Sequence, residues 1–238
     1  MLRNMAEVSM EVLCYNWMPD EDWQRTSKDV PERGGAKVTA FDLKQAGEGN
    51  LTDADGLPTT RTPADRLWEN LKRFLDDILP TAEDCNVRLA LHPDDPPLSN
   101  LHGQDRIITS NEAFERVVAL APSPYNGLCY CQGALAPAGV DVEAGIRKLA
   151  PHIHYAHFRN VSGVAEDFRE TFHDNGGLDM AALMRAYKEC GFDGPMRPDH
   201  APSLAGESNE TPGYETLGKL HAIGYMKGLY DQASFFES

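Results

Sequence analysis

The sequence has few basic residues for its length and no long apolar run. Asp and Glu number 37 against 22 Lys and Arg in 238 residues, which gives a formal net charge of −15. This charge argues against nucleic acid and anionic membranes as partners, and an anionic substrate would need a local positive centre. No stretch approaches the length that spans a bilayer, and the first residues lack a secretory pattern.

The cysteines do not form the pattern of a disulfide framework. There are five, an odd number without regular spacing, at positions 14, 85, 129, 131 and 190. Reduced thiols of this kind are typical of cytoplasmic proteins, so we expect a cytoplasmic location.

Short apolar segments alternate with helical patterns, as in parallel α/β sheets. Strands are predicted at 11–15, 87–91, 128–130, 154–158 and 195–197. Helices are predicted at about 63–78, 111–120, 142–149, 180–187 and 214–229, with Pro63 in the first turn of the first helix and a Thr109/Glu112 capping box before the second. A closed (β/α)8 barrel has eight strands. Either some strands escape detection, or residues 1–238 form one domain that is the later part of a barrel.

Residues 20–61 interrupt this alternation. The segment is polar and rich in glycine, and it is too long for an ordinary connection. We therefore expect a functional loop or a small insertion within the single domain.

Four consecutive predicted strands end in side chains that bind metals. These are His92, Cys131, His157 and Asp199. In a parallel α/β barrel the carboxyl ends of the strands meet at one rim, and two imidazoles, a thiolate and a carboxylate suit a divalent metal. Taken singly, each has a simpler interpretation as a turn residue, a buried thiol, a core histidine or a helix cap. Cys129, on the same face as Cys131, is a rival ligand.

Arginines accompany two of these positions. The two-residue period of a strand places Tyr155, His157 and Arg159 on one face, and Arg197 shares a face with Asp199. A guanidinium group near a metal is what an anionic ligand would require in so acidic a protein.

Eight motifs, in this order, resemble the mannonate dehydratase family. They are CYNWMP, DWQRT, LALHPDDPP, NGLCYCQG, HFRNV, ETFHDNGG, RPDH and NETPGYETLG, and the resemblance runs from about Val12 to Leu229. It implies a xylose-isomerase-like TIM barrel and a carbon–oxygen hydro-lyase. The family dehydrates D-mannonate to 2-keto-3-deoxy-D-gluconate in hexuronate (glucuronate) catabolism, with a divalent metal that is usually manganese.

The same motifs imply roles for individual residues. The family's metal ligands fall on His92, Cys131, His157 and Asp199. Cys131, not Cys129, matches the family cysteine, because it immediately precedes the Gln-Gly step of CYCQG. A thiolate is softer than manganese prefers, so iron, cobalt or zinc are alternative metals.

The resemblance also implies an acid/base pair and a site for the substrate carboxylate. The pair falls on His200 and Tyr214, without a division of roles between them. The carboxylate is expected to pair with an arginine, for which the candidates are Arg25, Arg159 and Arg197.

One departure from the family leaves the activity open. Family members carry about three further strands before CYNWMP, so the chain corresponds to the C-terminal part of a member, an α/β barrel with about five of eight βα units. The alternatives are a metal-dependent sugar isomerase or epimerase on the same fold, and a catalytically silent chain. The expected partners are a small sugar acid and further copies of the chain in a homo-oligomer, with no nucleic acid and no membrane.

Overall fold

The computed structural model describes residues 1–19, 22–47 and 60–235. Its centre is a curved parallel sheet in the order β1-β4-β7-β8-β11. The five strands are β1 (Val12–Tyr15), β4 (Arg88–Leu91), β7 (Asn126–Cys131), β8 (Ile153–His157) and β11 (Met196–Arg197). Each coincides with a predicted strand to within two residues, which confirms an α/β fold of the incomplete barrel type.

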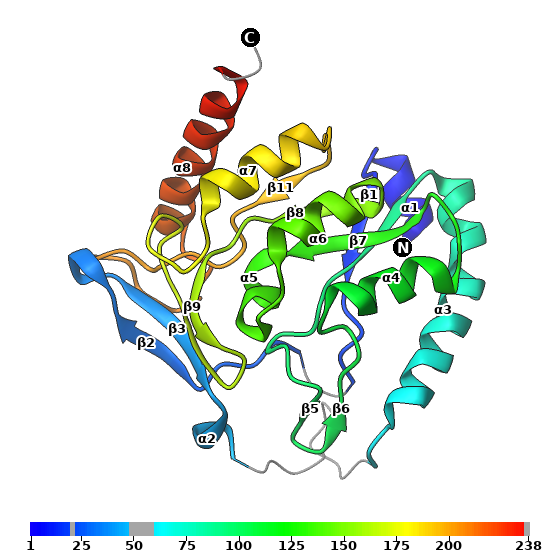
Figure 1. Cartoon of the computed structure of the whole chain (residues 1–238), viewed down its shortest axis with the longest axis horizontal. Helices are drawn as coiled ribbons and strands as arrows, with labels where there is room; N and C mark the ends of the chain where they lie inside the picture. Colours follow the sequence, from blue (N-terminus) through cyan, green and yellow to red (C-terminus); the bar gives the residue numbers. More distant parts are fainter. Residues whose placement is uncertain (20–21, 48–59, 236–238) are drawn as a thin grey trace.

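Helices follow the strands and cover the outer face of the sheet (Figure 1). The longer ones are α3 (Ala64–Cys85), α4 (Asn111–Leu120), α6 (Val142–Leu149), α7 (Met180–Glu189) and α8 (Thr216–Phe235). The short ones are α1 (Leu2–Glu7), α2 (Leu43–Ala46) and α5 (Gln132–Leu135), with 3-10 turns at Arg33–Gly35, Ala136–Ala138 and Ala150–His152. Helix α3 buries Leu67, Leu71 and Leu75 at helical spacing, because they face the core beneath β4.

Two predicted helix caps are wrong by one residue. Helix α4 is capped by Ser110, whose hydroxyl accepts from the Ala113 N–H at 3.2 Å, in place of the Thr109/Glu112 box. Pro63 is the N-cap of α3 and lies outside its first turn. There the Ala64 N–H donates to Asp105 at 2.9 Å, so a carboxylate distant in sequence supplies the cap.

A second, antiparallel sheet has the order β2-β3-β10-β9. Its strands are β2 (Ser27–Pro31), β3 (Lys37–Asp42), β9 (Val161–Val164) and β10 (Asp167–Glu170), and a small hairpin joins β5 (Asn100–Leu101) to β6 (Gln104–Asp105). The described part of segment 20–61 is therefore largely the β2–β3 hairpin, and 20–21 and 48–59 lie outside the described residues. Phe41 and Phe168 are buried between these strands and the rest of the chain.

The antiparallel sheet lies to the left of β7 and β8 in Figure 1, at the carboxyl end of the parallel strands. It brings Glu170, the last residue of β10, and Arg25, two residues before β2, toward the rim where the parallel strands end. Side chains from two sheets can therefore meet at one place.

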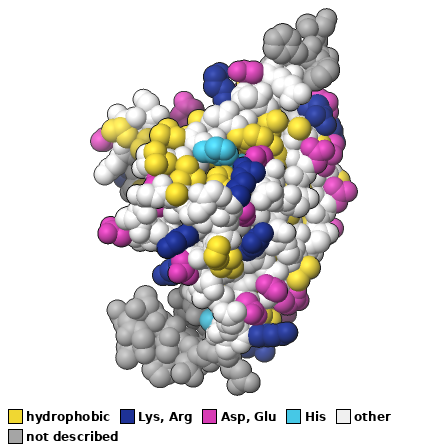
Figure 2. Space-filling view, turned by 90° about the vertical axis from the view of Figure 1, so that its left-hand side faces the viewer, with side chains coloured by type: hydrophobic (Ala, Val, Ile, Leu, Met, Phe, Trp, Pro, Cys, Tyr) yellow, Lys and Arg dark blue, Asp and Glu magenta, His cyan; other side chains and the backbone are white. Residues whose placement is uncertain are grey.

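The outer face of α8 is unusually apolar. Leu217, Leu220 and Ile223 are 49–59% exposed, and Figure 2 shows hydrophobic side chains gathered on the upper half of one side of the molecule. Among the described residues, no helix combines the length and apolar character needed to cross a bilayer.

Candidate metal centre

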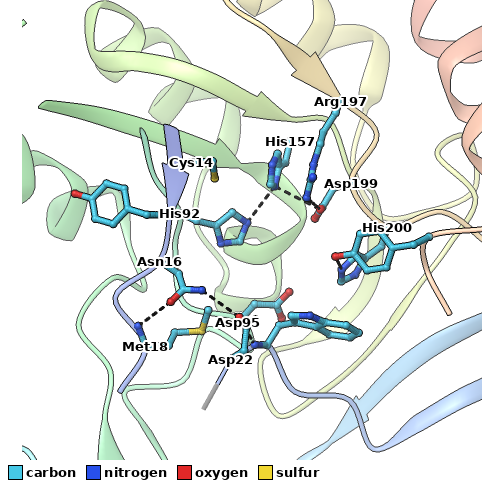
Figure 3. A pocket seen from close by; sticks show the side chains of 13 residues that line it. Cys14, Asn16, Met18, Asp22, His92, Asp95, His157, Arg197, Asp199 and His200 are labelled. Carbon is cyan, nitrogen blue, oxygen red and sulfur yellow. Dashed lines mark hydrogen bonds and ion pairs between the residues drawn. The ribbon is translucent and has the colours of Figure 1, made fainter. Parts of the chain in front are cut away.

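Four side chains converge at the carboxyl ends of β4, β7, β8 and β11. His92, Cys131, His157 and Asp199 each offer one ligand atom, and these atoms lie within 4.8 Å of one another. His92 Nε2 is 3.1 Å from His157 Nδ1, and His157 Nδ1 is 3.5 Å from Asp199 Oδ1. Figure 3 shows His92, His157 and Asp199 turned toward one another.

The sheet register explains this convergence. Cys131 of β7 pairs with His157 of β8, and Arg197 of β11 pairs with the same histidine. Residues that are paired across parallel strands point to the same side, so Cys131 and His157 share the concave face. Asp199 follows β11 with φ of 58°, a left-handed conformation that Asp tolerates better than most residues.

His92 is oriented by the chain that follows it. Its Nδ1 lies 2.6 Å from the Pro93 carbonyl, which can only accept, so Nδ1 carries the proton. Nε2 is then the nitrogen with a free lone pair, and it faces His157. This is the usual arrangement of a metal-binding histidine, whose other nitrogen donates to a carbonyl.

The donor set fits a divalent cation. Although burial opposes it, Asp199 raises the pKa of His157 to about 10, which shows how strongly this place favours positive charge. Burial also opposes ionisation of Asp199, but His200, His157 and Arg159 hold its pKa well below the usual range. Two imidazole nitrogens, a sulfur and an ionised carboxylate around one point are donors that transition metals accept.

A cavity of about 210 Å³ opens beside this centre. Its lining includes Asn16, Asp22, Trp23, Arg197 and Tyr214 together with three of the four candidate ligands. Cys131 is fully buried and lies behind this lining.

His200 and Tyr214 meet at the edge of the same cavity. His200 Nε2 lies 2.8 Å from the Tyr214 hydroxyl, and His200 Nδ1 lies 3.0 Å from Glu170 Oε1. Burial opposes ionisation of Glu170, but Arg159, His200 and Arg25 lower its pKa to about 2. An ionised carboxylate only accepts, so His200 Nδ1 is the donor and Nε2 accepts from Tyr214.

The three predicted carboxylate-binding arginines lie in two different settings. Arg25 and Arg159 are almost fully buried beneath the cavity. Arg25 binds both oxygens of Asp95 at 2.9 Å and Glu170 at 2.6 Å. Arg159 binds Asp95 at 2.8 Å and Glu170 at 2.9 Å.

Arg197, in contrast, has a side chain that is 41% exposed, and it lines the cavity. One of its terminal nitrogens donates to Asp199 at 2.7 Å. Of the three arginines, Arg197 alone lines the cavity, so its partly exposed guanidinium group is the one that can reach a ligand there.

Sequence reasoning missed Asp95 and Glu170 as functional residues. Both lie inside motifs singled out above, HPDDPP and ETFHDNGG, but neither ends a strand of the parallel sheet. The available signal was electrostatic, because arginines buried near a metal centre need carboxylate partners.

We expect Glu170→Gln to lower the free energy of unfolding by about 3–5 kcal/mol at pH 7, because two buried guanidinium groups lose a charged partner. Glu170 has a folded pKa of about 2 against an ordinary 4.5. Its stabilisation is thus complete above pH 4.5 and is lost as the pH falls toward 2. Denaturant unfolding at several pH values should show a shallower acid slope in the variant.

The matched control is Glu143→Gln, which removes an exposed partner of Arg147. It should change stability by less than about 1 kcal/mol. An unchanged acid slope in Glu170→Gln would contradict the ionised state assigned to this carboxylate.

We expect His157→Ala to lose most of the bound metal, because it removes a donor that lies between His92 and Asp199. Elemental analysis of the purified chain measures this directly. His152→Ala, just before the same strand, is the control and should keep its metal. Equal metal content in both variants would remove His157 from the centre.

Comparison with known proteins identifies the family of the chain. A family model described as D-mannonate dehydratase (UxuA) matches residues 1–59 and 58–237. A mannonate dehydratase of Thermotoga petrophila is 34% identical over 267 residues, which cover 97% of this chain and 72% of that protein. One from Thermotoga neapolitana is 34% identical over 270 residues, covering 98% and 73%.

Solved structures point the same way. The crystal structure of mannonate dehydratase from Streptococcus suis serotype 2 matches with a TM-score of 0.89 and 34% identity, covering 98% of this chain and 68% of that one. A D-tagatose 3-epimerase-like protein matches with a TM-score of 0.61 at 14% identity, covering 100% and 68%. The second likeness is one of fold alone.

Proposed function

The chain belongs to the mannonate dehydratase family, and we propose that it dehydrates D-mannonate to 2-keto-3-deoxy-D-gluconate in hexuronate catabolism. The observation that carries the proposal is the meeting of four metal-binding side chains beside the Glu170–His200–Tyr214 chain of hydrogen bonds. We infer that His92, Cys131, His157 and Asp199 hold the metal, with manganese as the expected ion.

The reaction removes a proton from the carbon beside the carboxylate and a hydroxyl from the next carbon. When bound, the metal ion supplies positive charge that stabilises the anion developing next to the carboxylate. We assign the carboxylate itself to Arg197, because its guanidinium group lines the cavity and is partly exposed, whereas Arg25 and Arg159 are buried.

His200 is the base in this proposal. Its Nε2 has the lone pair, since Nδ1–H donates to Glu170, and the ionised carboxylate stabilises the imidazolium once the proton arrives. Trp23 packs its ring 4.8 Å from the His200 ring and limits its rotation. Glu170 is thus a positioning residue for His200.

Tyr214 is the acid. Burial, with the charge of Asp199 adding to it, raises the pKa of its hydroxyl, so it stays protonated at neutral pH. It donates its proton to the departing hydroxyl, which leaves as water. The proton taken by His200 can then return to the tyrosinate across the 2.8 Å contact, which restores both groups, and the enol product rearranges to the keto acid.

The alternatives are less well supported. Epimerase structures share only the fold with this chain, at 10–17% identity, and the candidate ligands include a cysteine and a single carboxylate. A catalytically silent chain differs from both enzymes in forming no product, which an activity assay can test. The single domain, the cytoplasmic location and the homo-oligomer stay predictions.

The purified chain, incubated with D-mannonate and Mn²⁺, should release 2-keto-3-deoxy-D-gluconate, measured by mass spectrometry or a colour assay for 2-keto-3-deoxy acids. Epimerised sugar acid without the keto acid would favour the epimerase. No product despite one bound metal per chain would favour the silent chain.

His200→Ala and Tyr214→Phe should each lower kcat by about 10²–10⁴-fold, because each removes a proton-transfer group. Neither is among the four candidate ligands, so metal content should stay near that of the unaltered chain. A variant that keeps its metal and its turnover would lose the role assigned to it.

A further inference from the structure

A second group of metal-binding side chains lies next to the first. The sulfurs of Cys14 and Cys129 and one ring nitrogen of His157 all lie within 4.8 Å of one another. Only His157 belongs to both groups. Neither Cys14 nor Cys129 has a part in the proposed dehydration.

The sheet brings the two sulfurs together across an intervening strand. Cys14 is on β1 and Cys129 on β7, with β4 between them. The register partner of Cys14 on β4 is Ala90, whose side chain is only a methyl group. A small residue on this face leaves room for the thiols to approach over it. Cys129 also lies two residues before Cys131, on the same face, and so one step deeper in the sheet.

Two members of this second group are buried, and its histidine has a ring nitrogen that is unpaired within the described part of the chain. Cys129 is fully buried and His157 is 3% exposed. The Nε2 of His157 is buried and has no hydrogen-bond partner among the described residues. Figure 3 shows Cys14 on the other side of the His157 ring from Asp199.

An ion could reach the group from two sides. Cys14 lines the cavity of the candidate metal centre, and it also lines a separate cavity of about 450 Å³ with Val12, Arg88 and Tyr155. The thiol is thus partly accessible even though Cys129 is not.

We propose that Cys14, Cys129 and His157 form a second cation site, which takes a soft divalent ion such as Zn²⁺ or Cd²⁺. Both thiols and the His157 ring release protons to solvent as two metal–sulfur bonds and one metal–nitrogen bond form, and no oxidant or reductant takes part. Two sulfurs and one nitrogen favour soft ions more strongly than the one sulfur, two nitrogens and one oxygen of the first centre.

The shared histidine couples the two sites. A soft ion at the thiol pair would bind the His157 ring, which is also a candidate ligand of the first centre. The positive charge of that ion would then lie next to the first centre. We therefore expect bound Cd²⁺ at the second site to weaken Mn²⁺ binding at the first.

The test is a titration of the full, reduced chain with Cd²⁺. Binding is monitored through the ultraviolet absorption of the cadmium–sulfur bonds. The unaltered chain should bind two ions, the tighter at the thiol pair. Cys14→Ser and Cys129→Ser should each lose that tighter ion, whereas Cys131→Ser should keep it and lose the weaker one. Cys85→Ser and Cys190→Ser are the matched controls and should keep both.

A chain that binds one Cd²⁺, lost only in Cys131→Ser, would overturn the proposal. So would two bound ions in Cys14→Ser, in Cys129→Ser and in both controls alike. A buried serine can destabilise the sheet, so the number of bound Cd²⁺ ions should also be measured in the unaltered chain by cadmium NMR. It should show two resonances, one in the range of a two-sulfur site, and a single resonance would contradict the second site.

The titration needs no substrate. If the chain does not dehydrate D-mannonate, the Cd²⁺ titration can still be interpreted. If the second site does not bind Cd²⁺, the result of the D-mannonate assay still stands. The coupling has its own readout in the unaltered chain. The first equivalent of Cd²⁺, which fills the tighter site, should lower the Mn²⁺ affinity to a fixed value, and the affinity should fall further only when more Cd²⁺ competes for the first centre. A Mn²⁺ affinity that falls in proportion to Cd²⁺ from the first addition would show that Cd²⁺ simply displaces Mn²⁺ from the first centre.

Discussion

The burial of Arg159 is the constraint on which the rest of the site depends. Its side chain has no exposed surface, and an unpaired guanidinium there would cost several kcal/mol. The charge is offset by Asp95 at 2.8 Å, Glu170 at 2.9 Å and Asp199 at 3.4 Å. These carboxylates come from a loop after β4, from the antiparallel sheet and from the end of β11, so one guanidinium ties three parts of the chain together.

Arg159 contacts both the candidate metal centre, through Asp199, and the support of the proposed acid/base pair, through Glu170. Asp199 is a candidate metal ligand, and Glu170 holds His200. A shift of Arg159 would disturb both at once. A chain with a net charge of −15 thus concentrates its buried positive charge where carboxylates must stay ionised.

The strands and the candidate ligands were predictable because they depend on local pattern. An apolar run read with period two indicates a buried strand, and the carboxyl ends of parallel strands meet at one rim, which is enough to bring His92, His157 and Asp199 together. Pattern alone could not decide between Cys129 and Cys131, which share a face. The structure brings Cys131 into the four-ligand group and Cys129 against Cys14.

The antiparallel sheet and Glu170 escaped prediction for the opposite reason. Strand β2 has the sequence SKDVP and is largely exposed, so it lacks the alternation that marks a half-buried strand. The pairing of β3 with β10 depends on contacts between residues that lie more than a hundred positions apart in the sequence. Tyr214 was singled out by family resemblance, since a tyrosine before a helix has no local mark of catalysis.

An incomplete barrel can still assemble this site because of the order of its strands. The four candidate ligands follow β4, β7, β8 and β11, which are neighbours in the sheet. The groups that support them come from the antiparallel sheet and from the segment before β2, and Tyr214 comes from the turn before α8. The candidate metal ligands, the proposed acid/base pair and the buried arginines therefore all belong to the described part of the chain, where the parallel and the antiparallel sheet together hold them.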